Sequence, residues 1–418
     1  MENNKNPNIR FKGFTDPWEQ RKLGELSSSF EYGLNAAAKE YDGENKYIRI
    51  TDINDESREF KQEDITSPDT DLSSAENYKL SEGDILFART GASVGKSYIY
   101  KASDGLVYYA GFLIRARIKP EYNSEFVFQN TLTGNYEKFI KVTSMRSGQP
   151  GVNAQEYSQY QIMMPSKPEQ DKISDCLRNL DNLITLHQRK YNKLLNVKKS
   201  MLEKMFPKNG SNIPEIRFKG FTDPWEQRKL SEIATMHARI GWQNLRTSEF
   251  LDNGDYMLIT GTDFMDGAVN FDTCHYVERE RYEQDKHIQI RNGSILITKD
   301  GTLGKVAYIQ GLTMPATLNA GVFNVEIRDE KEVDNRYLFQ YLKAPFLMDY
   351  VDKKATGGTI KHLNQNILVD FPVVLPQKDE QAKIGEYFLG IDNLITLHQR
   401  ELEKLQNIKK SMLEKMFV

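Results

Sequence analysis

LDNLITLHQRKYNKLLNVKKSMLEKMF, residues 180–206, returns nearly unchanged as IDNLITLHQRELEKLQNIKKSMLEKMF, residues 391–417. Neither copy contains glycine or proline, and apolar residues recur at steps of three and four or a multiple of seven. This spacing is typical of a coiled-coil seam. The seam positions are Ile173, Leu177, Leu180, Ile184, Tyr191, Leu194, Met201 and Met205 in the first helix, and Ile384, Phe388, Ile391, Ile395, Leu402, Leu405, Met412 and Met416 in the second. Each helix therefore has an apolar stripe that needs a partner, and the simplest partner is the other copy.

The repeat extends to the start of each half. IRFKGFTDPWEQRKL, residues 9–23, recurs without change at residues 216–230. Thr15 or Asp16 before Pro17 is typical of an N-cap followed by proline at the first helical position. We therefore expect a short helix to open each half, and the whole half to be duplicated.

The bulk composition is that of a globular protein. The 418 residues suffice for two domains with connecting helices, and 39% of them are hydrophobic and 28% charged. No run approaches the roughly 18 apolar residues of a membrane span, and the first residues lack a signal-peptide core, so we expect a cytoplasmic protein. Cys176 and Cys274 are the only two cysteines, which argues against a disulfide framework or a thiolate metal site.

The formal net charge is only −3, so any contact with nucleic acid must come from a local basic surface. Residues 189–204 are one candidate, because six lysines and arginines there face a single acid, Glu203. A solvated helix face explains this stretch about as well as phosphate contacts do.

Between the repeated segments the pattern changes to short strands, turns and helices, which predicts α+β domains. Strands are expected at residues 47–51, 84–88, 97–100 and 112–118 in the first half and at 256–260, 294–298, 306–309 and 322–327 in the second. Helices are expected at residues 124–138 and 335–350.

Two glycine-bearing turns, residues 90–96 and 300–305, occupy matching places in the two halves. Glycine permits backbone shapes that other residues resist. We expect these turns to hold four basic residues near a common edge in their respective domains: Arg89, Lys96, Lys299 and Lys305.

A second glycine-bearing loop precedes each long helix, at residues 144–157 and 353–367. Both loops are rich in the side-chain types that read base edges in a DNA groove, although a polar surface loop has the same composition. The candidates are Arg146, Gln149 and Asn153 in the first loop and Lys354, Lys361 and Asn364 in the second.

Proline followed by acid, at residues 165–170 and 376–381, starts each long helix. A helix of about 38 residues at 1.5 Å per residue is a rod of roughly 55 Å. PKNGSNIP, residues 207–214, lets the chain turn back, which favours antiparallel packing. The predicted division is a first domain at 1–165, a central spacer helix at 166–206, a second domain at 207–376 that begins with a linker at 207–215, and a distal spacer helix at 377–418.

Motifs for catalysis are missing. GASVGKS, residues 91–97, has three residues between its glycines where a phosphate loop requires four. No dinucleotide fingerprint, no Asn-Pro-Pro-aromatic tetrapeptide of amino-methylating enzymes and no paired His and Cys spacing occurs. His187 and His398 occupy equivalent seam positions, where an interhelical hydrogen bond is expected rather than a metal ligand or a base.

Several features of the sequence match a known family: the duplicated half, the GDIL and SGQPGVN elements, and the repeated helix with its PSKPEQDKI, LDNLITLHQRK and LEKMF segments. In these features the chain resembles the specificity subunit of type I restriction-modification enzymes. The resemblance covers essentially the whole chain. It implies two target recognition domains separated by a pair of long antiparallel helices related by a pseudo-two-fold axis, with the helices binding modification subunits. The second domain departs from the pattern, because TGGTIKHLN stands in place of the SGQP-type loop.

The resemblance also implies that this chain is not an enzyme and holds no cofactor. Methyl transfer from S-adenosylmethionine to adenine is expected on two modification subunits, and ATP- and magnesium-dependent translocation and cleavage on restriction subunits. Each domain would read one block of a bipartite, asymmetric site on double-stranded DNA. Two alternatives stay open: a self-contained nuclease or methyltransferase, which the missing motifs disfavour, and an assembly scaffold that binds proteins without reading DNA sequence.

Overall fold

The computed structural model describes residues 6–145, 149–208, 211–301, 303–354 and 363–418. It forms two compact units, one made of residues 1–190 with 398–418 and the other of residues 191–397. Each unit contains a mixed α/β domain and one half of each long helix. The α+β class is confirmed, while the compact units divide in the middle of the long helices rather than at their ends.

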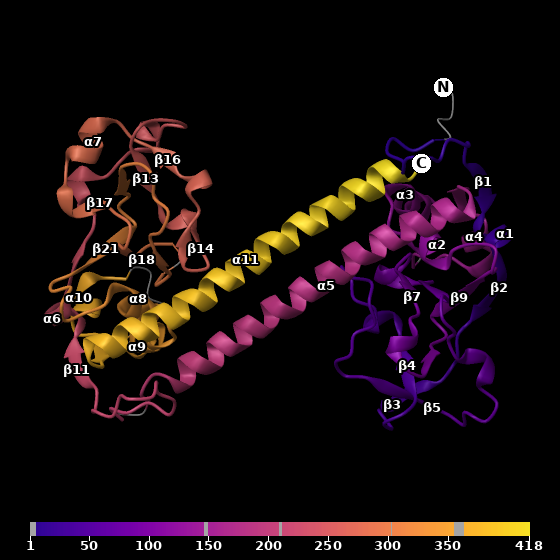
Figure 1. The fold of residues 1–418 in the computed structure, drawn as a ribbon, viewed down its shortest axis with the longest axis horizontal. Coiled ribbons are helices and arrows are strands. Elements are labelled where there is room, and N and C mark those ends of the chain that lie inside the picture. The colour runs from indigo at the N-terminus through magenta and orange to yellow at the C-terminus, as the bar shows by residue number, and fades with distance from the viewer. Residues whose placement is uncertain (1–5, 146–148, 209–210, 302, 355–362) are drawn as a thin grey trace. The chain divides into compact units, whose positions relative to one another are not determined.

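The repeated segments lie in the two longest helices, α5 (Lys167–Lys204) and α11 (Lys378–Met416), which Figure 1 shows. In the first unit the Nζ atom of Lys409 lies 2.6 Å from the Oδ1 atom of Asp181, and the Nδ1 atoms of His398 and His187 are 3.1 Å apart. Since residue numbers rise along one helix as they fall along the other, the pairing is antiparallel. The expected hydrogen bond between the two histidines is confirmed.

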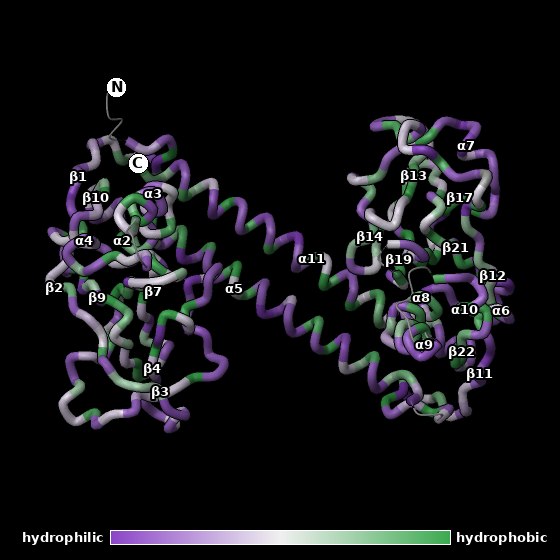
Figure 2. The backbone as a smooth tube through the Cα atoms, turned by 180° about the vertical axis from the view of Figure 1, so that it is seen from behind, coloured by the Kyte–Doolittle hydropathy of each residue, from purple (hydrophilic) through white to green (hydrophobic). Residues whose placement is uncertain are grey.

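Figure 2 shows hydrophobic and hydrophilic positions alternating along both long helices. The predicted seam is buried where the helices meet the domains: Ile173 and Leu177 in the first unit and Ile384 and Phe388 in the second are at most 1% exposed. The remaining seam residues are buried or half-buried. In the part of the chain that the structure describes, no helix combines the length and apolar character needed to cross a membrane.

The phenylalanine that follows each long helix is inserted into a domain core. Phe417 stacks on Phe126 at a centroid distance of 5.3 Å and meets the edge of Trp18 at 6.5 Å. Phe206 meets Trp225 at 6.3 Å with perpendicular rings. The repeated tryptophan and the repeated LEKMF segment therefore form the same aromatic contact in each unit, which explains why both are duplicated.

A buried ion pair holds the start of each half against a long helix. Both guanidinium contacts from Arg10 to the Glu169 carboxylate measure 2.8 Å, and the equivalent contacts from Arg217 to Glu380 measure 2.7 and 2.8 Å. Both glutamates lie in the first turn of their helix, where a negative charge is favoured. In the first unit the N-terminal segment also meets the end of α11, because the Ile9 amide donates to the Lys415 carbonyl at 3.0 Å.

The domain of the first unit is built on a four-stranded sheet in the order β2-β9-β6-β7. Its strands are β2 (Ser27–Tyr32), β9 (Leu113–Ile118), β6 (Ile85–Ala88) and β7 (Ser97–Ile99). The pairs β1 (Glu19–Lys22) with β10 (Gln161–Met164), β3 (Ala37–Glu40) with β5 (Thr66–Asp69) and β4 (Lys46–Ile48) with β8 (Val107–Tyr109) complete it, with helices α1 (Leu23–Leu26), α2 (Ser124–Asn130), α3 (Gly134–Thr143) and α4 (Ala154–Ser158).

The domain of the second unit repeats this plan with a sheet in the order β12-β21-β18-β19. Its strands are β12 (Ala234–His237), β21 (Val322–Ile327), β18 (Ile295–Thr298) and β19 (Val306–Tyr308). A second sheet contains β16 (His275–Tyr276), β13 (Met257–Ile259), β20 (Ala316–Leu318) and β17 (Gln289–Ile290). The other strands form the pairs β11 (Glu226–Lys229) with β22 (Pro372–Leu375) and β14 (Phe264–Met265) with β15 (Ala268–Val269). The helices of this domain are α6 (Leu230–Ile233), α7 (Arg279–Glu283), α8 (Asn335–Lys343), α9 (Phe346–Lys354) and α10 (Gln365–Val369). Every strand that the sequence predicts overlaps one of these strands.

One helix prediction is wrong, and the two other helical stretches are confirmed with a break in each. The residues after Pro17 form strand β1 instead of a helix, because they pair with β10, and the helix α1 begins only at Leu23. The helices expected at 124–138 are confirmed as α2 and α3, which are separate because the Thr133 side chain caps a new helix by accepting from the Tyr136 amide. The helical stretch expected at 335–350 is likewise confirmed, as α8 and α9, which are separate because Pro345 cannot continue α8.

Candidate nucleic-acid interface

The two glycine-bearing loops of the first domain meet at one edge of the sheet. Arg89 follows β6, its amide donates to the Phe112 carbonyl at 3.1 Å, and its carbonyl accepts from the Val152 amide at 2.9 Å. The Gly91 amide donates to the Pro150 carbonyl at 3.0 Å. Backbone hydrogen bonds thus join loops that are about 60 residues apart in sequence. The sequence predicted each loop separately, and the structure brings them together.

The Arg89 guanidinium lies close to the faces of two exposed aromatic rings. Its guanidinium carbon is 5.1 Å from the centroid of Tyr32 and 5.9 Å from that of Phe112. The rings are 44% and 59% exposed, although large apolar side chains are usually covered. Attraction between a cation and the ring faces holds the guanidinium in place. Sequence reasoning missed both aromatic residues, and the only available signal was their position at the ends of two strands.

Two further predicted residues lie beside Arg89. Gln149 is exposed, and its Nε2 atom would be 3.2 Å from a Cβ atom added at Gly91, whose positive φ of 73° also favours glycine. Asn153 is exposed and caps α4 by accepting from the Glu156 amide at 2.9 Å. Both amide side chains therefore reach solvent at the same edge as Arg89.

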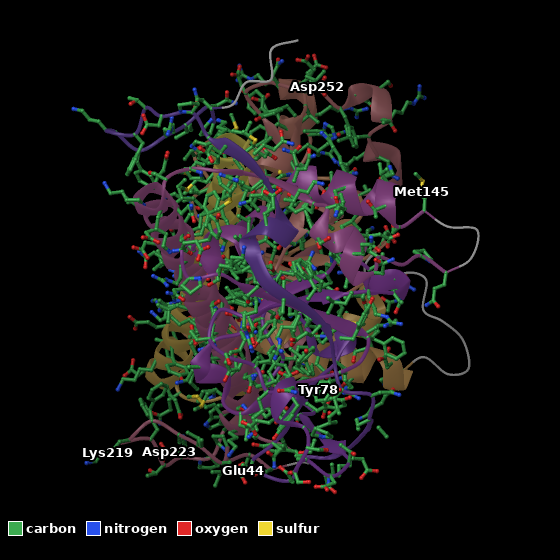
Figure 3. All side chains as sticks on the ribbon, turned by 90° about the vertical axis from the view of Figure 1, so that its right-hand side faces the viewer. Glu44, Tyr78, Met145, Lys219, Asp223 and Asp252 are labelled. Atoms are coloured by element: carbon green, nitrogen blue, oxygen red, sulfur yellow. The ribbon has the colours of Figure 1, made fainter. Side chains whose placement is uncertain are left out.

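A tyrosine beneath this edge fixes its shape. The Tyr157 hydroxyl donates to the Ala88 carbonyl at 2.7 Å and accepts from the Gly95 amide at 3.2 Å, so it joins the two ends of the turn. Burial raises the pKa of Tyr157, which keeps the hydroxyl protonated and able to donate. Met145, which ends the segment after α3, is 70% exposed, and Figure 3 shows it at the surface.

Lys96 has a different environment from the other predicted residues of the first domain. Its side chain is buried, and its Nζ atom lies 2.5 Å from the Oδ1 atom of Asp55 and 3.3 Å from the Ile53 carbonyl. These contacts tie a neighbouring loop to the sheet, and the exposed edge does not include the ammonium group. Arg146 lies outside the described residues.

The second domain builds the same edge with different side chains. The Lys299 amide donates to the Gly321 carbonyl at 2.9 Å, and the Lys299 carbonyl accepts from the Leu363 amide at 2.9 Å. These bonds match those of Arg89 in the first domain. Glycine stands where Phe112 stands, and the Lys299 ammonium lies 5.4 Å from the centroid of Phe323.

Three other predicted residues of the second domain are exposed. Lys305 follows the turn, and its amide donates to the Thr298 hydroxyl at 3.0 Å. Lys354 ends α9 with its ammonium 5.5 Å from the centroid of Tyr350, and Asn364 precedes α10. Lys361 lies outside the described residues. Lys299, Lys305, Lys354 and Asn364 thus provide three cations and one amide on the second domain.

The long helices carry exposed leucines at duplicated positions. Leu183 and Leu186 on α5 are 43% and 45% exposed, and Leu394 and Leu397 on α11 are 46% and 52% exposed. Both pairs belong to the repeated NLITL sequence. An apolar surface that occurs twice in the chain is suited to two contacts of the same kind.

One cation of the basic stretch at residues 189–204 is removed from the surface. Lys198 is buried, and its Nζ atom lies 2.5 Å from the Oδ1 atom of Asp392. Burial, and secondarily the neighbouring Lys343, lowers the pKa of Lys198. Its role is therefore to join the two long helices within the second unit.

Comparison with known proteins places these features in one family. The family model described as type I restriction modification DNA specificity domain matches residues 15–196 and 222–407. The chain therefore belongs to this family and contains its domain twice. As the resemblance predicted, it is the noncatalytic DNA sequence-recognition subunit of a type I restriction-modification complex.

Two relatives come from Methanocaldococcus jannaschii. The chain is 23% identical over 414 residues to the type I restriction enzyme MjaVIII specificity subunit, with 95% of this chain and 91% of the relative covered. It is 24% identical over 422 residues to the putative MjaX specificity subunit, with 95% and 92% covered. The crystal structure of the S subunit of a type I restriction-modification system from M. genitalium has the same fold, with a TM-score of 0.66, 15% identity and 99% of both chains covered.

Proposed function

We propose that each unit reads one half of a bipartite, asymmetric site on double-stranded DNA through the edge that carries Arg89 in the first domain and Lys299 in the second. The duplicated leucines bind two copies of the modification subunit. Restriction subunits join through that complex. The DNA target and the chemistry of the partners make the cytoplasm the expected location.

One observation carries this proposal: the same main-chain hydrogen bonds present different side chains in the two domains. Arg89 and Lys299 each lie between a donated and an accepted backbone bond of nearly equal length. The surrounding side chains differ, with Phe112 in one domain and Gly321 in the other. Two domains that share these backbone bonds but present different side chains are suited to two different half-sites.

The side chains at the edges suit two kinds of DNA contact. An arginine can donate two hydrogen bonds to the O6 and N7 atoms of guanine, and Gln or Asn can bond adenine in the same bidentate manner. Arg89, Gln149 and Asn153 offer these groups in the first domain. Lysine is better suited to phosphate contacts that set orientation, so Lys299, Lys305 and Lys354 position the second domain while Asn364 contributes to base reading.

Catalysis belongs to the partners. S-adenosylmethionine binds the modification subunits, and ATP and magnesium act on the restriction subunits. The present chain supplies the site at which adenine is methylated or from which restriction starts. Two identical leucine surfaces support a ratio of two modification subunits to one recognition chain.

The test is genome-wide mapping of methylated adenines in cells that express the complex with Gln149→Ala or with Asn364→Ala. We expect each variant to relax recognition in one half-site and to leave the other half-site unchanged. Complex assembly, measured by native mass spectrometry, should be the same in both. Unchanged methylation patterns would remove these residues from the interface, and binding that ignores DNA sequence in the intact complex would favour the scaffold alternative.

A further inference from the structure

Three potential metal ligands gather on the second domain. His237 ends β12, His287 lies in the short 3-10 helix Lys286–Ile288, and Glu326 belongs to β21. Their ligand atoms all lie within 4.8 Å of one another. Three separate segments of the chain therefore converge on one point.

The distances leave room for an ion. The Glu326 Oε2 atom is 3.7 Å from the His237 Nε2 atom and 3.8 Å from the His287 Nδ1 atom. These separations exceed those of hydrogen bonds. Ligands at about 2.1 Å from a tetrahedral ion are about 3.4 Å apart, so binding requires one imidazole to turn out of the stack and the His237 Nε2 atom to exchange its 3.0 Å contact with the Thr235 hydroxyl for the ion.

The backbone fixes the positions of all three residues. β12 and β21 pair with Thr235 opposite Glu326 and His237 opposite Asn324, which puts His237 and Glu326 on one face of the sheet. The Asn324 side chain donates to the His287 carbonyl at 2.9 Å, which ties the third ligand to the same strand. The two imidazole rings stack with centroids 4.4 Å apart and an interplanar angle of 20°.

A simple ion pair explains this arrangement less well. One imidazole suffices to pair with a carboxylate, whereas here two imidazoles face the same carboxylate oxygen. The two imidazoles would repel each other if both were protonated. His237, His287 and Glu326 are 29%, 64% and 47% exposed as side chains, so an ion has access from solvent.

We propose that His237, His287 and Glu326 bind one divalent transition-metal ion, with zinc as the natural occupant and water completing the coordination. Two imidazole nitrogens and one carboxylate oxygen form a ligand set that suits zinc, cobalt and nickel. The ion joins the segment around His287 to the sheet and so stabilises the second domain.

The first domain provides an internal contrast. Counted along the paired strands, Glu31 and Arg117 occupy the places of His237 and Glu326. Arg117 therefore places a cation where the second domain has the carboxylate of Glu326. The site therefore belongs to the second domain only, and it does not depend on the DNA contacts proposed above.

The experiment uses the full chain with any histidine tag removed and with metals stripped by EDTA. Zinc titration by calorimetry should give one equivalent, and cobalt should produce a visible absorption band of a nitrogen-ligated ion. His287→Ala and Glu326→Gln should each weaken zinc binding at least tenfold. His275→Ala, which changes an exposed histidine outside the cluster, should bind zinc like the parent chain.

Zinc should also slow hydrogen exchange at residues 285–290 in the parent chain and leave that segment of His287→Ala unchanged. His287 is mostly exposed, so its variants should fold, and His287→Gln serves as a second variant with a side chain of similar reach. Binding that is absent from the parent chain, or that is equally strong in His287→Ala and Glu326→Gln, would overturn the proposal.

Discussion

Breaking the ion pair between Arg10 and Glu169 should loosen the first unit alone. The Glu169 side chain is 1% exposed, the Arg10 side chain 14%, and their contact is bidentate. Replacing Arg10 by alanine leaves a carboxylate buried without its counterion. The second unit keeps its own equivalent pair, Arg217 with Glu380, and so serves as a control within the same molecule.

The magnitude follows from two opposing effects. Removing one partner of a buried ion pair costs about 3–5 kcal/mol. Glu169 lies in the first turn of α5, where the helix dipole stabilises a negative charge by about 0.3–1 kcal/mol. The Arg10 site is partly exposed, so water can solvate the carboxylate once the arginine is removed. Both effects reduce the loss of stability. We therefore expect a loss of roughly 2–3 kcal/mol, which corresponds to a 30- to 150-fold rise in local opening.

Native-state hydrogen exchange measured by mass spectrometry resolves this change by segment. In Arg10→Ala, amides of β1 and β10 should exchange roughly 30- to 150-fold faster, while those of β11 and β22 keep their rates. Arg217→Ala should give the mirrored result. The double variant Arg10→Ala with Glu169→Ala should recover part of the protection, because no charge is then left buried. Equal loosening of both units, or a double variant as unstable as the sum of the single ones, would refute the reasoning.

Three further predictions concern recognition, assembly and pH. Arg89→Ala should relax base choice in the first half-site by about 1–3 kcal/mol per lost bidentate contact, whereas Lys299→Ala, which removes a proposed phosphate contact, should weaken binding about equally for all site variants; competition binding of the assembled complex to site variants measures both. Leu186→Glu or Leu397→Glu should each reduce the number of bound modification subunits from two to one in native mass spectra, with two still bound contradicting the assignment. The pKa of His398 is lowered from 6.5 by burial and then by the neighbouring His187, so neutral His398 contributes stability above about pH 6.5 that is lost as pH falls below it. Thermal unfolding between pH 7.5 and 5 should therefore decline more in the parent chain than in His398→Gln, and parallel declines would contradict this account.

The helical spine could be predicted from sequence because its signal is local and long. A seam of apolar residues at steps of three and four has few interpretations over ten turns of helix, and the repeat supplies the partner. The linker favours the antiparallel pairing that the Lys409–Asp181 contact demonstrates. The same local reasoning failed after Pro17, where pairing with a strand about 140 residues away overrides a good capping sequence.

The candidate interface was predicted only in part, because exposure depends on tertiary packing. Lys96 and Lys305 occupy matching turns, yet one ammonium is buried against Asp55 and the other lysine is exposed. Nothing in the turn sequence distinguishes them, since Asp55 comes from a loop about 40 residues away. The rings of Tyr32 and Phe112 could not be placed beside Arg89 for the same reason.

The edge of each domain keeps its shape through main-chain bonds, and this has a consequence for specificity. The amide and the carbonyl of residues 89 and 299 are both used in holding the loops, whereas the contacts of their side chains among the described residues are with aromatic rings. A substitution there changes the side chain that, in the function proposed above, faces DNA, and leaves the main-chain bonds intact. Residue 89 is arginine and residue 299 is lysine, so the same main-chain bonds form with either side chain. A recognition chain built in this way can acquire a new DNA target through a few side chains, because the backbone that presents them does not depend on their identity.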